Sequence, residues 1–370
     1  MVTKKKPLAK KPSGTPVSSV PLIDDLRRMI EETRQGVAVT VNAALTLLYW
    51  RVGKRINEEI LKGERAEYGK EILATVSQEL VNDYGKGFSY SALTRMLKFN
   101  EVFPDAQIVA TLSQTLSWSH FCELFPLEKP LQRDFYAEMC RIERWSVRTL
   151  RQKIGSMLYE RTALSKKPDE LARIELDALR DEDKLTPDLV FRDPYFLDFL
   201  GLTGAFQEKD LEAAILREME AFILELGVGF SFVARQKRFT LDGDDFYIDL
   251  LFFHRRLRCL VAVELKLGKF RPEHMGQMEL YLRWLDKYER QEGESAPIGM
   301  ILCAGKKQEQ IELLELDKSG IHVAEYLTDS LPKEKLQAKL RKAVAIARKR
   351  LENRDEKTNA ENVVNLLEGE

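Results

Sequence analysis

Two apolar runs flank a short basic segment in residues 244–266, which read DDFYIDLLFFHRRLRCLVAVELK. The runs cover 246–253 and 257–265, and the basic segment is His254-Arg255-Arg256. Both runs are rich in the β-branched and aromatic residues that favour strands. This stretch therefore predicts a β-hairpin, with the rest of a C-terminal α/β domain arranged around it.

Three charged residues interrupt the apolar runs: Asp249 in the first, and Glu264 and Lys266 in the second. With the turn centred on 255–256, Asp249 lies opposite Ala262, and Glu264 and Lys266 follow on the same face because side chains alternate along a strand. Asp249 and Glu264 are then diagonal neighbours, roughly 7–8 Å apart at the backbone. Two carboxylates at that spacing can reach one cation, so we expect the three charges to share a site.

The other face of the predicted hairpin carries no charge and is expected to pack against the body of the domain. Its members are Phe246, Ile248, Leu250, Phe252, Cys259, Val261, Val263 and Leu265. On the charged face, burial without a partner is costly. A metal ion is one compensating partner, and a buried Asp-Lys-Glu ion cluster without metal is the alternative.

Fourteen residues separate Asp249 from Glu264-Leu265-Lys266. This spacing on adjacent strands resembles the signature of the PD-(D/E)xK nuclease superfamily, with Ile248 in place of its nominal proline. Nearly the whole chain resembles the YhcG-type bacterial nuclease-domain proteins. The resemblance implies a Mg²⁺ (or Mn²⁺) site in which Asp249, Glu264 and the backbone carbonyl of Leu265 bind the metal. Lys266 would orient or deprotonate the attacking water.

Further site residues are predicted on the neighbouring elements. Gln277 and Tyr281 lie four residues apart on one helix face, and they resemble the Q-xxx-Y element of RecB-type nucleases; plain packing of Tyr281 is the alternative. Arg235-Gln236 resembles the GRQ segment of YhcG-type proteins, which implies that Gln236 lies near the metal or pairs with Lys266. On the first helix of this core we select Glu218. The other glutamates considered there are Glu212, Glu220 and Glu225.

Composition limits the class of protein. The chain has 370 residues, 44% of them hydrophobic, with 58 basic and 59 acidic side chains and a net charge of −1. No apolar run approaches the ~20 residues of a membrane span, and no apolar segment follows the basic start, so we expect a cytoplasmic protein without membrane association. Four widely spaced cysteines indicate neither a zinc site nor a disulfide framework. Contacts with nucleic acid must therefore come from local basic patches.

Periodicity and breaker residues divide the chain into five parts. We expect a disordered basic tail at 1–21, a helical, DNA-binding domain at 22–164 and a linker at 165–209. The nuclease domain then covers 210–330, and a charged helix and tail follow at 331–370. The fold class is thus α/β, with an N-terminal all-α, helix-turn-helix-like domain and a C-terminal restriction-endonuclease-like domain of order α-β-β-β-α-β.

Two features of the helical part suggest contact with DNA. A helix, a turn containing Gly85 and a second helix follow the outline of a helix-turn-helix, which helical hairpins in general also share. Residues 116–154 faintly resemble the DNA-binding region of ParB-type partition proteins. Five cations lie beside Trp145 within this segment, enough for a phosphate-contacting face; a solvated helix face with Trp145 in the core is the alternative. They are Arg141, Arg144, Arg148, Arg151 and Lys153. Near the hairpin, Arg255, Arg256 and Lys269 are further candidates.

We therefore predict a Mg²⁺-dependent endodeoxyribonuclease that its helical domain places on DNA. A catalytically silent scaffold or regulator with the same fold is the alternative, and RNA stays open as a substrate because nothing in the sequence reports on a 2′-hydroxyl. An apolar stripe on the helix at 333–352 suits packing on its own domain or a homodimer.

Overall fold

The chain divides into two compact units, residues 1–121 and 122–370. The predicted helical domain at 22–164 is shared between them. The predicted tail at 1–21 and most of the predicted helix at 333–352 lie outside the described residues. The computed structural model describes 39–58, 66–162, 164–202, 207–314 and 316–328, together with 334–336, 338, 340–342 and 345.

The described part of the N-terminal unit is helical, which confirms the class predicted for this region. Its elements are a helix over 39–58, α2 (Ala66–Tyr84), the 3-10 turn η1 (Lys86–Phe88), α3 (Tyr90–Val102), α4 (Ala106–Ser113) and most of α5 (Trp118–Leu124). Leu93 and Met96 of α3 form a core with Ile56 and Leu73 from the preceding helices. Gly85 has a φ of 85°, a left-handed conformation that glycine adopts without strain, and it separates α2 from η1 and α3.

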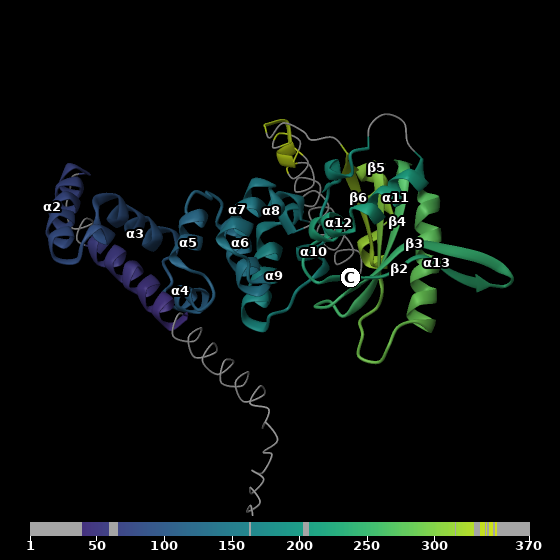
Figure 1. Ribbon diagram of the computed structural model, residues 1–370, viewed down its shortest axis with the longest axis horizontal. Helices are drawn as coiled ribbons and strands as arrows, with labels where there is room; N and C mark the ends of the chain where they lie inside the picture. Colours follow the sequence, from purple (N-terminus) through teal and green to yellow (C-terminus); the bar gives the residue numbers. More distant parts are fainter. Residues whose placement is uncertain are drawn as a thin grey trace, which may run out of the picture. The chain divides into compact units, whose positions relative to one another are not determined.

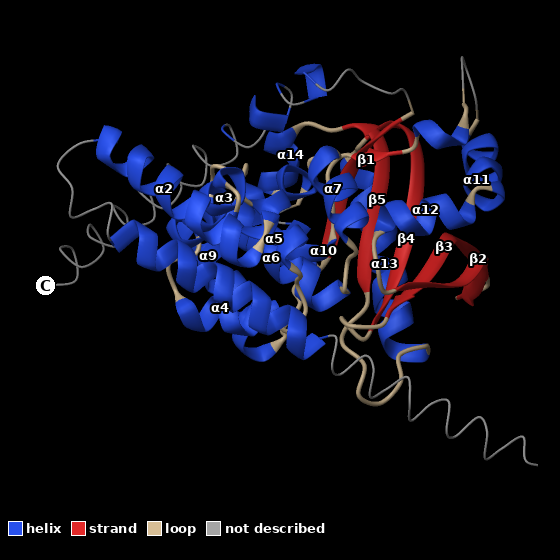
Figure 2. Ribbon diagram, turned by 60° about the vertical axis from the view of Figure 1, so that its left-hand side comes forward, coloured by secondary structure: helices blue, strands red, loops and turns tan. Residues whose placement is uncertain are grey.

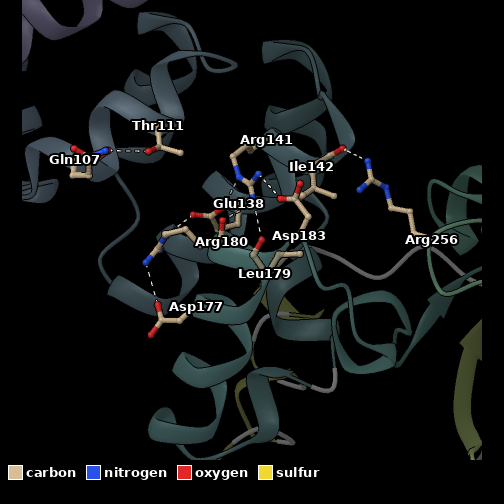
Figure 3. Close-up of polar contacts among 10 residues, drawn as sticks. All are labelled: Gln107, Thr111, Glu138, Arg141, Ile142, Asp177, Leu179, Arg180, Asp183 and Arg256. Carbon is tan, nitrogen blue, oxygen red and sulfur yellow. Dashed lines mark hydrogen bonds and ion pairs between the residues drawn. The ribbon is translucent and has the colours of Figure 1, made fainter.

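A group of helices opens the C-terminal unit. They are α6 (Pro130–Glu143), α7 (Val147–Gly155), α8 (Leu158–Arg161), α9 (Asp169–Glu182) and α10 (Pro187–Val190). The fully buried carboxylate of Glu138 joins α6 to α9, because it accepts hydrogen bonds from Arg141 Nε (2.8 Å) and Arg180 Nε (2.7 Å) (Figure 3). Arg141 therefore joins α6 to α9 inside the protein. Its predicted place on a phosphate-contacting face is wrong.

A mixed sheet with helices on both faces forms the rest of this unit, so the predicted α-β-β-β-α-β order is confirmed (Figures 1 and 2). In the described residues the strand order is β1-β6-β5-β4-β3-β2. The β2, β3 and β4 strands are antiparallel neighbours, and β5, β6 and β1 continue the sheet in parallel. Helices α11 and α12 pack on one face and α13 on the other. The elements are β1 (Tyr195–Phe196), α11 (Glu208–Arg217), α12 (Met219–Leu226), β2 (Phe230–Leu241), β3 (Asp244–His254), β4 (Cys259–Lys269), α13 (Pro272–Tyr288), β5 (Ile298–Gly305), α14 (Gln308–Leu313) and β6 (Ile321–Leu327).

In place of the linker predicted at 165–209, the structure has a segment that packs on the sheet. It contains α9 and α10, and β1 adds a parallel edge strand to β6. Half-buried Asp193 accepts hydrogen bonds from Lys166 Nζ (2.6 Å) and from the backbone N–H of Glu325 in β6 (3.0 Å). The segment that was predicted to be a linker therefore packs against the sheet and joins the helices to the nuclease-like core.

The first described residues of the C-terminal helix contact their own chain. Leu336 and Leu340 are buried in a small cluster with Met157. This contact corresponds to the first of the two alternatives for the apolar stripe, packing on its own domain. Among the described residues, no helix is long and apolar enough to cross a membrane.

Candidate active site

The alternation of side chains along β3 breaks at Asp249. Ile248 packs on the α13 side of the sheet together with Leu251, whereas Leu250 packs on the α11 and α12 side. Regular alternation would place residues 248 and 250 on the same face. On β2, the residue across from Asp249 is Gln236, and its φ of 44° is unusual for a side chain of this kind. The sheet is therefore kinked at the first predicted carboxylate, and the predicted single apolar face of β3 is wrong for this reason.

The turn between β3 and β4 is longer than the sequence predicts. It comprises residues 255–258, and Arg258 closes it with a left-handed φ of 54°. The predicted pairing of Asp249 with Ala262 is therefore wrong by two residues, because Ala262 pairs with Leu251. A shift of two preserves the face of every side chain. The register, if continued, brings position 264 directly across from Asp249.

The Asp249 carboxylate lies where β3 and β4 separate. The paired ladder ends at Leu250 and Val263. Beyond it, the N–H of Leu265 donates to Asp249 Oδ2 (2.9 Å), and Gln236 Nε2 donates to Oδ1 (3.0 Å). Burial raises the pKa of Asp249 in spite of these two hydrogen bonds. Asp249 thus bonds directly to the backbone of the residue that follows Glu264.

Glu264 is nearly fully buried beside Lys266, with 4% of its surface exposed. Its Oε1 accepts hydrogen bonds from Lys266 Nζ (2.8 Å) and Gln277 Nε2 (3.1 Å), while the buried Oε2 has no partner among the described residues. Burial, and then the negative charge of Asp249, raise the pKa of Glu264 to about 7. Burial disfavours the charge on Lys266, but its hydrogen bond to Glu264 and the negative charges of Glu264, Glu208 and Asp249 together outweigh this effect and raise the pKa of Lys266.

The structure brings Gln277 and Tyr281 of α13 to the same carboxylate. Gln277 Nε2 lies 2.5 Å from the Tyr281 hydroxyl as well as 3.1 Å from Glu264 Oε1. Tyr281 is buried and packs edge-on against Phe239 at a ring distance of 5.7 Å. Tyr281 therefore belongs both to the core and to the hydrogen-bond chain that ends at Glu264.

Glu212, rather than Glu218, is the glutamate that the first helix contributes. Glu218 lies exposed at the junction of α11 and α12, where its φ and ψ of −105° and 32° interrupt the helix. The carboxylate of Glu212 accepts a hydrogen bond from Gln236 Nε2 (3.0 Å), the same group that bonds Asp249. Glu212 was among the candidates in the sequence, but Glu218 was selected; the position of Glu212 next to buried Leu211, at the edge of the apolar stripe, was a usable signal.

The acidic side chains of this site suit a divalent cation. Within the described residues no group of three or more His, Cys, Asp or Glu side chains forms a ready metal cluster. Asp249 and Glu264 nevertheless provide carboxylate oxygens, the ligands that Mg²⁺ and Mn²⁺ prefer, and Mg²⁺ commonly keeps several waters. The buried Oε2 of Glu264 without a partner is the atom that a cation would satisfy. The residues present therefore fit the metal that the sequence predicts.

The cations predicted to contact DNA are not gathered at one place in the C-terminal unit. Arg144 and Arg148 are exposed, and Arg151 is exposed but ion-paired with Glu123 (2.5 Å). Lys153 is half-buried, and burial together with the charge of Arg192 lowers its pKa to about 8. Lys153 is therefore a poor member of an exposed face. Trp145 is buried in the core, as the alternative interpretation of this segment had it.

The basic residues at the hairpin turn lie at the end of the strands away from Asp249 and Glu264. Arg256 Nη2 donates to the carbonyl of Ile142 (2.5 Å) at the end of α6 (Figure 3). Arg255 and Arg256 are both exposed, so their predicted contact with DNA stays a prediction, at a place away from the two carboxylates. Lys269, by contrast, is exposed three residues beyond Lys266, at the end of β4 that carries the site.

Comparisons with known proteins agree with this architecture. Residues 188–341 match the family described as the YhcG PDDEXK nuclease domain, and residues 25–161 match the DUF1016 N-terminal domain. A protein of Escherichia coli (strain K12) named "Putative nuclease YhcG" is 36% identical over 323 residues, which are 79% of this chain and 85% of that protein.

Two solved structures are similar over part of the chain. A repair endonuclease from Pyrococcus abyssi is 22% identical, with a TM-score of 0.24 over 35% of this chain and 50% of its own. A structure titled as an EndoMS-dsDNA2 complex is 18% identical, with a TM-score of 0.26 over 35% of this chain and 49% of its own.

Proposed function

Because the chain belongs to the YhcG family of PDDEXK nuclease-domain proteins, we propose that it is a divalent-metal-dependent endonuclease that hydrolyses phosphodiester bonds of DNA. The observation that carries the proposal is the pair of carboxylates where β3 and β4 separate, of which Asp249 is half-buried and Glu264 is buried. Asp249 and Glu264 keep raised pKa values there, and Glu264 Oε2 has no partner among the described residues. Such a costly arrangement is explained when a cation binds between the two acids.

Asp249, Glu264 and the carbonyl of Leu265 would hold Mg²⁺ or Mn²⁺. When bound, the ion would supply charge neutralisation at the phosphate and a more acidic water. Lys266 has a raised pKa and so stays protonated. Its ammonium group would therefore orient the attacking water or stabilise the phosphate by donating hydrogen bonds, and the alternative role of proton acceptor is disfavoured.

Gln236 and Gln277 would hold the two acids in position from opposite faces of the sheet. Gln236 bonds Asp249 and Glu212 on the α11 side, and Gln277 bonds Glu264 on the α13 side. Amide donors to both carboxylates restrict their rotation before the metal or substrate arrives. Such preorganisation is what a metal-dependent hydrolase requires of its surrounding residues.

DNA is the substrate we propose, with the helical part of the chain providing additional contacts. Arg148, Arg151 and Lys269 are exposed cations that suit backbone phosphates. The glycine-containing turn between α2 and α3 is compatible with a helix-turn-helix reader. RNA is the alternative polyanion, and the assay below separates the two.

The proposal is tested with the full-length protein on supercoiled DNA, linear DNA and RNA, each with Mg²⁺, Mn²⁺ or EDTA. Asp249→Asn and Lys266→Ala are expected to lower metal-dependent cleavage by more than about 100-fold, because each removes part of the charge stabilisation at the phosphate. Asp245→Asn is the matched control, since this exposed acid lies on the same strand and contacts Arg238 and Thr240, away from the site. No cleavage by the wild type with either metal would favour a catalytically silent scaffold, and equal cleavage by Asp249→Asn would show that this carboxylate takes no part in the reaction.

A further inference from the structure

His274 lies on the same stripe of α13 as the residues that contact Glu264. It precedes Gln277 by three positions and Tyr281 by seven, spacings that place all three on one face of a helix. The rise per residue puts His274 roughly 4.5 Å along the helix axis from Gln277, toward the exposed start of α13. The imidazole therefore lies on the face of α13 that contacts Glu264, toward the start of the helix.

The hydrogen bonds of His274 leave one ring nitrogen for a ligand. The N–H of Arg271 donates to His274 Nδ1 (3.3 Å), so Nδ1 is an acceptor and the proton of the neutral ring is on Nε2. The Phe270 ring packs edge-on against the imidazole at 5.9 Å and limits its rotation. Among the described residues, no hydrogen bond is formed by Nε2. The ring thus presents an oriented N–H donor on the helix face that carries Gln277 and Tyr281.

The charges that act on His274 include Lys266 of the active site as well as its chain neighbours Glu273 and Arg271. Burial lowers the pKa of His274, and the next largest influence is the positive charge of Lys266, which lowers it as well. Glu208, whose carboxylate accepts a long hydrogen bond from the N–H of Leu267 (3.4 Å), acts on it in the opposite direction. The influence of Lys266 supports the position that the helical spacing gives.

We propose that the Nε2–H of His274 contacts the substrate of the nuclease, by donating a hydrogen bond to a non-bridging oxygen of the phosphate next to the scissile one. The inference rests on the proposed function. A phosphate at Asp249 and Glu264 has its neighbour one nucleotide along the strand. His274 lies nearly one helical turn along α13 from Gln277, which contacts Glu264, so it is displaced from the metal site and suits a neighbouring phosphate rather than the scissile one. His274 would then help to fix which bond of the strand lies over the metal site.

Two substitutions separate this role from that of a helix cap. His274→Asn places an acceptor oxygen where Nδ1 is and removes the Nε2 donor; His274→Gln places an amide N–H near the Nε2 position and loses the acceptor. For a substrate contact, Asn keeps the melting temperature but lowers kcat/KM by about 10- to 100-fold, the value of one hydrogen bond to a charged group. Gln recovers most of that activity at a lower melting temperature. The reverse pattern would show that His274 only caps α13.

A modified substrate identifies the phosphate. After the cleavage position is mapped, a single methylphosphonate replaces the adjacent phosphate and removes its charge and one acceptor oxygen. Wild-type activity is expected to fall by a factor close to that of His274→Asn, and the variant should show no additional loss, since both changes remove one interaction. Losses that multiply at every adjacent phosphate would overturn the contact. Absence of metal-dependent cleavage in the wild type would overturn the nuclease proposal together with it, whereas cleavage unaffected by Asn overturns the His274 contact alone.

Discussion

Glu225→Gln is expected to destabilise the C-terminal unit by about 3–5 kcal/mol, because it removes the charge that neutralises a buried arginine. Arg161 has 1% of its side chain exposed, and its Nη1 lies 2.5 Å from Glu225 Oε1. The same oxygen accepts the N–H of Phe196 (2.9 Å), and Oε2 lies 3.4 Å from Arg192 Nη1. Glutamine preserves the shape of the side chain but leaves two arginines without a counter-charge. This cluster joins α8 and β1 to α12, so its loss weakens the contact between the helices and the sheet.

The loss is measured as a change in thermal unfolding. In a unit of about this size, each kcal/mol lowers the melting temperature by about 2–4 °C, so Glu225→Gln should lower it by about 6–20 °C. Glu220→Gln is the matched control, because Glu220 is exposed on the same helix and should change stability by no more than about 0.5 kcal/mol. Equal melting temperatures for the two variants would refute the reasoning, since the buried arginine would then need no carboxylate.

The pH dependence provides a second measurement on the same pair of proteins. Burial tends to raise the pKa of Glu225, but the charges of Arg161 and Arg192 outweigh it and lower the pKa below its ordinary value. The stabilisation is therefore present above the unfolded-state pKa of about 4.3 and is lost as the pH falls through the folded-state value. The difference in stability between wild type and Glu225→Gln should shrink below about pH 4. A constant difference down to the acid limit would mean that the ionised carboxylate is not its source.

Two further predictions concern the N-terminal unit and the metal site. Gly53→Ala should lower the free energy of unfolding of the N-terminal unit by about 1–3 kcal/mol or more, because the added Cβ would lie 1.9 Å from the Met96 carbonyl oxygen. Chemical denaturation measures this loss, and Gly87→Ala is the control, because a Cβ at that position meets nothing within 4 Å. Binding of Mg²⁺ or Mn²⁺ should release protons and tighten between about pH 6 and about pH 8, because Glu264, with a pKa of about 7, must ionise to bind. Calorimetry in buffers of different ionisation enthalpy measures the release, and an affinity independent of pH would contradict the role of Glu264.

The order of elements in the nuclease-like domain could be predicted because each strand is an apolar run with clear ends. The pairing of β3 with β4 could not, since it depends on the left-handed conformation of Arg258, a residue type that gives no signal for it. The common face of Glu264 and Lys266 could be predicted, because side chains two residues apart on one regular strand lie on the same face. In the same way, the choice between Glu212 and Glu218 depends on a break in the helix at residue 218.

The availability of basic side chains for DNA could not be predicted from the sequence either. A count of basic residues cannot tell which guanidinium groups are used inside the protein. Arg256 bonds a backbone carbonyl 114 positions earlier in the chain, and Arg141 is held by Glu138 and Asp183. Of the candidates near the nuclease core, only those without such a tertiary role stay available for phosphate. Only the three-dimensional structure shows which basic side chains have such a role.

The break in alternation at Asp249 explains how groups from both faces of the sheet reach one site. A regular strand would turn Asp249 fully toward one layer of helices, and its carboxylate would then be out of reach of the other layer. The kink at Gln236 and Asp249 instead directs the carboxylate into the gap between β3 and β4, where the N–H of Leu265 is available. Gln236, which also bonds Glu212 of α11, and Gln277 from the α13 side can then donate to adjacent carboxylates. The kink in β3 makes the prediction from regular strand alternation wrong, and the same kink brings the groups of the site together.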